Sequence, residues 1–519
     1  MELSLAERVA QMVVVRASGH LFDHQIRYPA WEPPCDRLRY WLEELGVGGV
    51  IFVDGSAAEL AVRTQLLRSW AKIPLLLAAD IEEGVGQRFA GATWFPPPMA
   101  LGAIANRDPE MAERYAEEMG AVTAREALAI GLNWILAPVV DVNNNPDNPV
   151  INVRAFGETP ETAGRLAAAF IRGSHRYPVL TSAKHFPGHG DTAVDSHIEL
   201  PTIPHSPERL AAVELPPFKE AIAAGVDSVM GAHLLIPAWD ETLPATLSPE
   251  ILTGKLRKAL GFEGLIVTDA LVMGAIADRY SLAEASVLAV EAGADILLMP
   301  EDPEVTIQAV CEAVESGRIS PERIQMSCDR IAYMKKKISP PERQRQFGLE
   351  DLSTPAANQT VELILRESVR AGAAVPLQLP PNPGREGWRN LVVADDLLNC
   401  PVLGHHTPAI AVPGHRGFTL QLLDRHGRTP PGEDGELSPT LLQLFIRGNP
   451  FRGSAGLSEI ARIWFKKLLK TGELRALVIY GSPYTLEQFL PEIPSSLPYV
   501  FSDAQIPAAQ AIALDLLLG

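Results

Sequence analysis

The densest group of polar side chains in the sequence lies in one segment, KHFPGHGDTAVDSH, from Lys184 to His197. Three histidines, two aspartates and a lysine stand among glycines and a proline, which favour a loop over a helix. Histidine titrates near neutral pH, and a neighbouring aspartate can orient its ring, so the segment suits general acid/base chemistry. A lone loop histidine is more often a solvated or packing residue. The number of polar groups in one loop favours the functional interpretation.

A second candidate for chemistry is Asp269, which ends the apolar run GLIVTDAL that begins at Gly264. A carboxylate at such a place is costly to bury, so it must pair with a cation, bind a metal or face a cavity. The alternative is a structural role for Asp269, because aspartate is a favoured N-cap residue of a following helix.

These residues need elements that bring them together. As far as about residue 335, short runs rich in Val, Ile and Leu alternate with stretches of helical period, the pattern of buried parallel strands. The eight runs are VAQMVVV, GVGGVIFV, PLLLAAD, NWILAPVVDV, VLTSAKHF, SVMGAHLLI, GLIVTDAL and ADILLMP. The first could equally be the end of a helix. Eight such units predict a (β/α)8, TIM-like barrel.

Polar residues recur at or near the carboxyl ends of these runs, at Asp80, Asp141, Lys184, His185, His233 and Asp269. In a parallel barrel all of these ends meet at one rim, where barrel enzymes build their active sites. We therefore expect one polar site at this rim.

The composition changes over residues 337–358, where Pro, Gln and charged residues show no apolar period. We therefore predict a catalytic barrel over 1–336, a linker over 337–358 and a smaller open α/β sandwich domain over 359–519. In the last part we expect a helix from Gln359 to Ala373, strands at NLVVADD, AIAVPG, LLQLFIRG, ALVIYGS and YVFSDA, and a helix in LSEIARIWFKKLLKTG. It has no phosphate-binding glycine loop, and its role stays open.

Composition narrows the class of protein. The chain has 519 residues, of which 47% are hydrophobic and 21% charged, a globular balance that excludes disorder and fibrous folds. A net charge of −18 argues against nucleic acid as a partner. Four scattered cysteines indicate free thiols in a reducing compartment. Neither a leader-like amino terminus nor an apolar stretch long enough for a bilayer is recognisable. We expect a cytoplasmic protein without membrane association.

Several motifs together resemble glycoside hydrolase family 3, in particular its β-N-acetylglucosaminidases of the NagZ type in a two-domain form. They are DVNNNPDNPVINVRAFG, KHFPGHGDTAVDSHIELP, PATLS, GLIVTDAL and AGADILLMP, and the resemblance covers roughly residues 3–335. It implies an exo-acting, retaining enzyme that removes terminal N-acetylglucosamine from peptidoglycan fragments through a covalent glycosyl-aspartate. No metal or organic cofactor is implied, and we expect a monomer.

The resemblance also implies roles for individual residues. Asp269 matches the nucleophile, His197 the general acid/base and Asp195 its orienting partner. Retaining glycosidases usually use two carboxyl groups, so an imidazole here replaces the second. A neutral imidazole repels an anion less than a carboxylate does, which leads to the hypothesis that phosphate competes with water as acceptor.

Substrate contacts follow by the same resemblance, and they match Asp80, Arg88, Arg154, Lys184 and His185. The chain departs from the motif at four places, where Ile81, Glu83, Val85 and Ala155 replace the more usual Gln, Gly, Arg and Ser. These departures bear on the fine substrate preference. We interpret Asp141 as structural, supporting Arg154, and His233 as a residue that lines the pocket.

Three alternatives remain open. A family 3 β-glucosidase or β-xylosidase would share Asp269 without needing His197. A metal-dependent hydrolase could use His185, His189, Asp191 and His197 as ligands, although their spacing matches no closed set. A catalytically silent sugar-binding protein would bind a sugar without turning it over.

Overall fold

The computed structural model describes residues 3–339, 347–372, 374–426, 438–447 and 459–519. The chain divides into two compact units, residues 1–360 and 361–519. Part of the expected linker, 340–346, lies outside the described residues, whereas Leu349–Asp351 forms a 3-10 turn and α13 (Pro355–Ser368) follows it.

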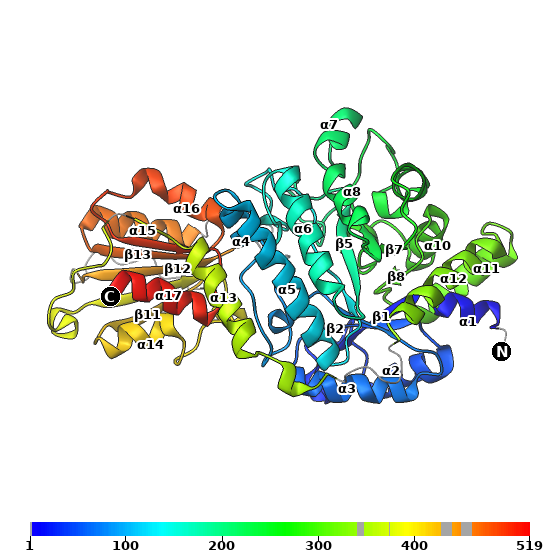
Figure 1. Ribbon diagram of the computed structural model, residues 1–519, viewed down its shortest axis with the longest axis horizontal. Helices are drawn as coiled ribbons and strands as arrows, with labels where there is room; N and C mark the ends of the chain where they lie inside the picture. Colours follow the sequence, from blue (N-terminus) through cyan, green and yellow to red (C-terminus); the bar gives the residue numbers. More distant parts are fainter. Residues whose placement is uncertain (1–2, 340–346, 373, 427–437, 448–458) are drawn as a thin grey trace. The chain divides into compact units, whose positions relative to one another are not determined.

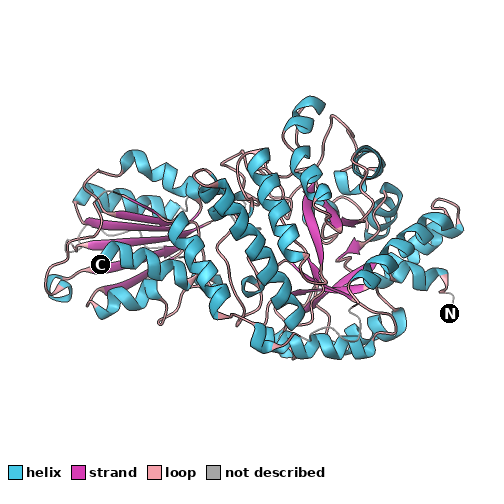
Figure 2. Cartoon of the chain, viewed as in Figure 1, coloured by secondary structure: helices cyan, strands magenta, loops and turns pink. Residues whose placement is uncertain are grey.

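The first unit contains eight parallel strands, as the sequence predicts (Figures 1 and 2). They are β1 (Val13–Ser18), β2 (Gly49–Val53), β3 (Leu76–Ala79), β4 (Trp134–Ile135), β5 (Leu180–Phe186), β6 (Ser228–Gly231), β7 (Leu265–Thr268) and β8 (Leu297–Leu298). Neighbours in sequence are neighbours in space from β1 to β7, and β1 also pairs with β8. A parallel bridge between Val267 and Ile296 brings β7 to β8 and closes the barrel.

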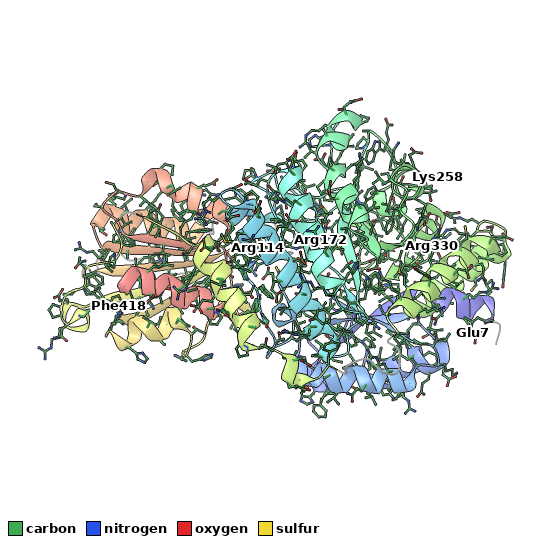
Figure 3. All side chains as sticks on the ribbon, in the orientation of Figure 1. Glu7, Arg114, Arg172, Lys258, Arg330 and Phe418 are labelled. Atoms are coloured by element: carbon green, nitrogen blue, oxygen red, sulfur yellow. The ribbon has the colours of Figure 1, made fainter. Side chains whose placement is uncertain are left out.

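Helices follow the strands in turn. They are α2 (Cys35–Tyr40), α3 (Ala57–Trp70), α4 (Met99–Ala105), α5 (Pro109–Ala129), α6 (Pro160–Ser174), α7 (Pro207–Ala212), α8 (Leu215–Ala223), the π-helix η6 (Glu250–Ala259), α9 (Gly274–Ala277), α10 (Leu282–Ala292), α11 (Pro303–Glu315) and α12 (Pro321–Lys337). Serine side chains cap several of them; Ser56 accepts from the Glu59 N–H, and Glu59 accepts from the Ser56 N–H in return. Charged side chains such as Arg172 of α6 lie on the outside (Figure 3).

The first apolar run, from Val9, is divided between two elements. Its first two residues end helix α1 (Leu5–Ala10), and the strand begins only at Val13. Ser4 caps the helix in a reciprocal capping box with Glu7, which fixes its start. The helical alternative noted for this run is therefore correct for its beginning.

The second unit is an open α/β sandwich, as predicted. Its six-stranded sheet has the order β11 (Thr419–Leu423), β10 (Arg389–Ala394), β12 (Thr440–Ile446), β13 (Leu474–Gly481), β14 (Tyr499–Ser502) and β9 (Arg370–Ala371). Only β9 is antiparallel among these described strands. Helices α15 (Glu459–Thr471) and α16 (Pro483–Phe489) cover one face, and α14 (Pro408–His415) and α17 (Pro507–Leu518) cover the other (Figure 1).

Two predictions for this unit are wrong. The run AIAVPG is not a strand but most of α14, because Pro408 sits in the first helical turn, where its missing N–H is not needed. The strand that follows β10 in the sequence is instead β11, a partly exposed edge strand with a weaker apolar pattern, which pairs with β10. The helix expected to reach Ala373 ends at Ser368, and Arg370–Ala371 forms the edge strand β9; Ala373 itself lies outside the described residues.

Candidate active site

The loop that follows β5 carries an aspartate–histidine pair. Nδ1 of His197 lies 2.8 Å from Oδ1 of Asp195, and the same oxygen accepts from the His197 backbone N–H at 2.9 Å. The Asp195 side chain is 1% exposed and that of His197 21% exposed. Because a carboxylate only accepts hydrogen bonds, this contact places a proton on Nδ1 and orients the ring.

Asp269 follows β7 directly and remains partly exposed. Its Oδ1 accepts from the N–H of Ala270 at 2.7 Å. Burial by itself raises the pKa of this carboxyl, but the imidazoles of His233, His185 and His197, together with the Ala270 N–H, bring the pKa below its usual value. Asp269 is therefore ionised at neutral pH. The Gly274 N–H, in the segment after Asp269, donates to the His197 carbonyl at 3.3 Å, which brings the His197 loop to this segment.

Lys184, at the end of β5, lies between two carboxylates. Its Nζ is 2.6 Å from Oδ1 of Asp80 and 2.6 Å from Oε1 of Glu82. Burial lowers the pKa of the ammonium, but the two carboxylates outweigh this and raise the pKa above its usual value. The Lys184 side chain is sealed, whereas that of Asp80 is 31% exposed. The pair therefore offers a carboxylate, held in place by a cation, to a molecule at the rim.

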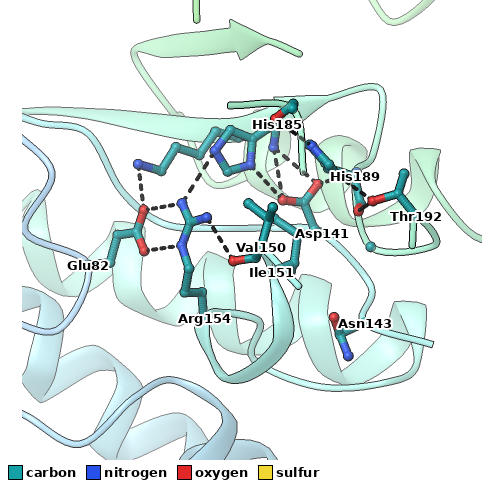
Figure 4. Close-up of polar contacts among 12 residues, drawn as sticks. Glu82, Asp141, Asn143, Val150, Ile151, Arg154, His185, His189 and Thr192 are labelled. Carbon is teal, nitrogen blue, oxygen red and sulfur yellow. Dashed lines mark hydrogen bonds and ion pairs between the residues drawn. The ribbon is translucent and has the colours of Figure 1, made fainter. Parts of the chain in front are cut away.

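Arg154 joins the same network (Figure 4). It grips Glu82 with two hydrogen bonds of 2.8 Å and donates a third, of 3.1 Å, to the carbonyl of Val150. Its Nη2 also lies 3.5 Å from Nε2 of His185. Burial raises the pKa of Glu82, but the charges of Arg154 and Lys184 bring it well below the usual value. A bidentate pair of this kind fixes the plane of the guanidinium.

Asp141 organises two of the three histidines of the loop, and it acts on Arg154 only indirectly, through its charge and through His185. Its carboxylate lies 2.8 Å from Nδ1 of His185 and accepts from the backbone N–H groups of His185 and of His189, the latter at 2.7 Å (Figure 4). The reason is local: Asp141 follows β4, beside β5, whereas Glu82 from the β3 loop already neutralises Arg154.

The remaining predicted residues have smaller parts. Arg88 donates from Nε to the backbone carbonyl of Asp80 at 3.1 Å. His233, expected to line the pocket, is fully buried; Nδ1 contacts the hydroxyl of Thr246 and Nε2 the carbonyl of Ala270. It therefore holds the segment that carries Asp269 through its contact with the Ala270 carbonyl.

Sequence reasoning missed Glu82, which holds both Lys184 and Arg154. The available signal was its place two residues after Asp80, at the end of an apolar run. The four residues considered as metal ligands do not converge. His189 contacts Thr192 and Ser196, and Asp191 pairs with His205 at 2.8 Å. No cluster of three or more such groups with metal-binding geometry occurs among the described residues.

Comparison with known families adds a match over most of the chain. Residues 4–334 match the model of the glycosyl hydrolase family 3 N-terminal domain. The chain belongs to glycoside hydrolase family 3. Residues 383–519 match the bacterial glycosyl hydrolase family 3 C-terminal domain, so this family 3 protein has the second domain as well.

Individual relatives agree with this assignment. The family 3 chain is 35% identical over 321 residues to β-hexosaminidase A of Pseudoalteromonas piscicida, covering 56% of this chain and 53% of that protein. It is 32% identical over 311 residues to the β-N-acetylglucosaminidase/β-glucosidase of Cellulomonas fimi, covering 58% and 54%. The chain thus spans about half the length of these two relatives.

A solved structure resembles both units. The family 3 β-N-acetylglucosaminidase of Paenibacillus sp. strain FPU-7 is 31% identical, with a TM-score of 0.80, and the match covers 100% of this chain and 98% of that one. In the described parts of the present chain, no helix has the length and apolarity needed to cross a membrane.

Proposed function

We propose that this family 3 protein is a retaining β-N-acetylglucosaminidase in which Asp269 is the nucleophile and His197 the acid/base. One observation carries the proposal. An imidazole, oriented by the buried Asp195 at 2.8 Å, stands on a loop whose His197 carbonyl accepts at 3.3 Å from the N–H of Gly274, in the segment that follows Asp269. An ionised carboxylate beside an oriented proton carrier is the pair that a double displacement requires.

In the first step the Asp269 carboxylate attacks the anomeric carbon, and the glycosidic C–O bond breaks. Nε2 of His197 donates its proton to the departing oxygen, and Asp195 stabilises the imidazolium before this transfer. The product is a glycosyl-aspartate ester and a free alcohol. In the second step Nε2 takes a proton from water, and the resulting hydroxide equivalent displaces Asp269. Two inversions retain the β configuration.

The network of Asp80, Lys184 and Arg154 is suited to the sugar itself. The partly exposed Asp80 carboxylate accepts from sugar hydroxyls, and Arg154, which is 11% exposed, donates to sugar oxygens. The buried Lys184 keeps the Asp80 carboxylate charged and in place. His185, fixed by Asp141, adds its Nε2 beside Arg154. The Paenibacillus relative is named a β-N-acetylglucosaminidase and the Pseudoalteromonas relative a β-hexosaminidase, and these names support N-acetylglucosamine as the sugar. A fragment of peptidoglycan, cleaved in the cytoplasm, is the substrate we expect.

A second candidate is β-glucosidase activity. It is favoured by the Cellulomonas relative, whose name includes both activities. The two candidates differ in whether the 2-acetamido group contributes to binding in the transition state, so relative kcat/KM for the two sugars separates them.

The proposal is tested by turnover of the p-nitrophenyl β-glycosides of N-acetylglucosamine and glucose. Wild type is compared with Asp269→Asn and His197→Ala, and with the control variants Asp329→Asn on α12 and His415→Ala on α14. We expect preference for the acetamido sugar, loss of activity in the first two variants and normal activity in the controls. Preference for glucose would favour the second candidate, and binding without turnover would show a silent sugar-binding protein.

The acceptor is tested in the same assay with inorganic phosphate added. Because the deprotonated imidazole is neutral, phosphate meets less repulsion than it would beside a second carboxylate. Formation of N-acetylglucosamine 1-phosphate would support competition between phosphate and water. Free N-acetylglucosamine alone at high phosphate would refute it.

A further inference from the structure

The catalytic loop contains a histidine that the proposed mechanism does not use. His189 is 1% exposed, and each ring nitrogen has a hydroxyl partner at 2.9 Å: Nδ1 contacts Oγ1 of Thr192, and Nε2 contacts Oγ of Ser196. Thr192 and Ser196 stand on either side of the turn that leads to His197. The ring therefore joins the two arms of this loop, the first with residues 189–192 and the second with residues 195–197.

The arm that contains His189 is firmly attached to the β4 side of the barrel. The His189 N–H donates to Asp141 at 2.7 Å, and its carbonyl accepts from Nδ2 of Asn148 at 2.8 Å. The same Asn148 nitrogen donates to the carbonyl of Gly190 at 3.0 Å. A Cβ at Gly190 would lie 1.8 Å from the carbonyl oxygen of Val142, so this arm packs against the β4 loop backbone to backbone.

The other arm contains the acid/base. Ser196 directly precedes His197 and is 2% exposed. The His197 carbonyl accepts from the Gly274 N–H at a long 3.3 Å. The 2.9 Å contact between Ser196 and His189 therefore ties this arm to the anchored one, one residue away from the imidazole that must meet the glycosidic oxygen.

We propose that His189 is a positioning residue that holds His197 in place through its hydrogen bond to Ser196. This inference rests on the proposed function, because it assigns His189 a part in the proton transfers of His197. Burial, followed by the positive charge of His185, lowers the pKa of His189 to about 4, so the ring is neutral. A neutral ring has one donor and one acceptor nitrogen, which matches two hydroxyl partners.

Two amide substitutions separate the two contacts. His189→Gln carries a polar atom near the position of Nε2 and keeps a link to Ser196, whereas His189→Asn reaches only the position of Nδ1 and keeps the link to Thr192. Ser196→Ala removes the other partner of the critical bond. Thr192→Val is the matched control that removes the bond to Nδ1. Circular dichroism and thermal unfolding show whether each variant is folded.

The measured quantity is kcat/KM for aryl N-acetyl-β-glucosaminides with leaving groups of different acidity. A 2,4-dinitrophenolate departs without a proton, whereas a 4-methoxyphenolate needs one. We expect His189→Asn and Ser196→Ala to lose at least about tenfold more activity on the poor leaving group than on the good one. His189→Gln and Thr192→Val should retain most of the wild-type ratio. The double variant His189→Asn/Ser196→Ala should be no worse than either single one.

The outcomes are distinct. Equal losses on both leaving groups in folded His189→Asn would mean a general structural role and would overturn the inference. Additive losses in the double variant would do the same, because the two residues would then act independently. If wild type turns over neither substrate, or if His197→Ala shows no dependence on the leaving group, the proposed function itself fails.

Discussion

The two ends of the barrel both bury carboxylates among cations, yet they are built differently. At the carboxyl rim, Asp80 is 31% and His197 21% exposed, although their partners Lys184 and Asp195 are sealed. At the opposite end, Asp227 and Asp295 stand just before β6 and β8, and their side chains are 1% and 0% exposed. The rim leaves a carboxylate accessible, whereas the opposite end buries its carboxylates and leaves only their cationic partners, such as Lys337 and Arg330, partly exposed.

The hydrogen-bond partners of Asp295 show why its carboxylate is buried. Asp295 accepts from Arg257 at 2.7 Å, from the Ser327 hydroxyl at 2.6 Å and from Arg330 at 3.1 Å. These contacts tie η6 and α12 to the start of β8. A buried ion cluster is therefore not by itself a sign of chemistry. What distinguishes the rim is that the carboxylates of Asp80 and Asp269 remain accessible.

The largest expected effect is the loss of activity when Asp269 at the rim is substituted. Asp269→Asn should lower kcat/KM by about 10⁴-fold or more, because the nucleophile is removed while its hydrogen bond to Ala270 can persist. Thermal unfolding should change little, because asparagine keeps the size of the side chain and an oxygen that can accept from the Ala270 N–H. A large loss of stability would break the distinction between the two ends.

The reverse pattern is expected at the amino end. Asp295→Asn should destabilise the folded state by about 5 kcal/mol, because Arg257 and Arg330 lose a buried counter-charge. The kcat/KM of the protein that remains folded should stay close to wild type. Urea unfolding and assays below the transition measure both. Loss of activity without loss of stability would contradict the comparison.

A third kind of buried carboxylate occurs in the second unit. Asp503, just after β14, is 1% exposed, and neither oxygen has a hydrogen-bond partner in the described structure. Burial raises the pKa of this carboxyl to about 7, well above its usual value. The folded state binds this proton more tightly than the unfolded chain does. The contribution of Asp503 to the free energy of unfolding is therefore greatest below about pH 4, and it falls by about 4 kcal/mol in total as the pH rises to about 7.

Asp503→Asn should remove this pH-dependent term. Comparison of its unfolding free energy with that of wild type at pH 5 and pH 8 isolates the term from every other titrating group. We expect the variant to gain relative stability at pH 8. Equal pH dependence in the two proteins would show that Asp503 finds a partner when it is ionised.

The smallest effect is expected from Glu82→Gln. The amide keeps the shape of the side chain but removes the charge that balances Lys184 and Arg154. We expect KM for the N-acetylglucosaminide to rise about tenfold, with a smaller change in kcat, because these cations hold the sugar-binding side of the site in place and transfer no proton. Steady-state kinetics of the variant and of wild type measures both constants. A fall in kcat alone would place Glu82 in the chemical steps.

Much of the first unit could be predicted from the sequence, because buried parallel strands leave apolar runs that end in polar residues. All eight runs contain a strand, and Asp80, Lys184 and Asp269 lie at strand ends as expected. The run AIAVPG failed because a short apolar segment has no period that distinguishes a strand from a buried helix.

Partnerships within the site were harder to predict than positions. Glu82 and Arg154 are 72 residues apart, and Asp141 and His185 are 44 apart. Which carboxylate neutralises which cation depends on how two loops meet in space, and residue types alone allow several pairings. The Asp195–His197 pair was predictable because only two positions separate its members, so the loop itself brings them into contact.

The central claim is that Asp269 forms a covalent bond to the sugar. A 5-fluoro derivative of N-acetyl-β-glucosaminyl fluoride, which forms the glycosyl-enzyme faster than it is hydrolysed, can trap it. Peptide mass spectrometry should then find one sugar adduct on the peptide that contains Asp269, and none in Asp269→Asn. An adduct on another residue, or inactivation without any adduct, would contradict the account.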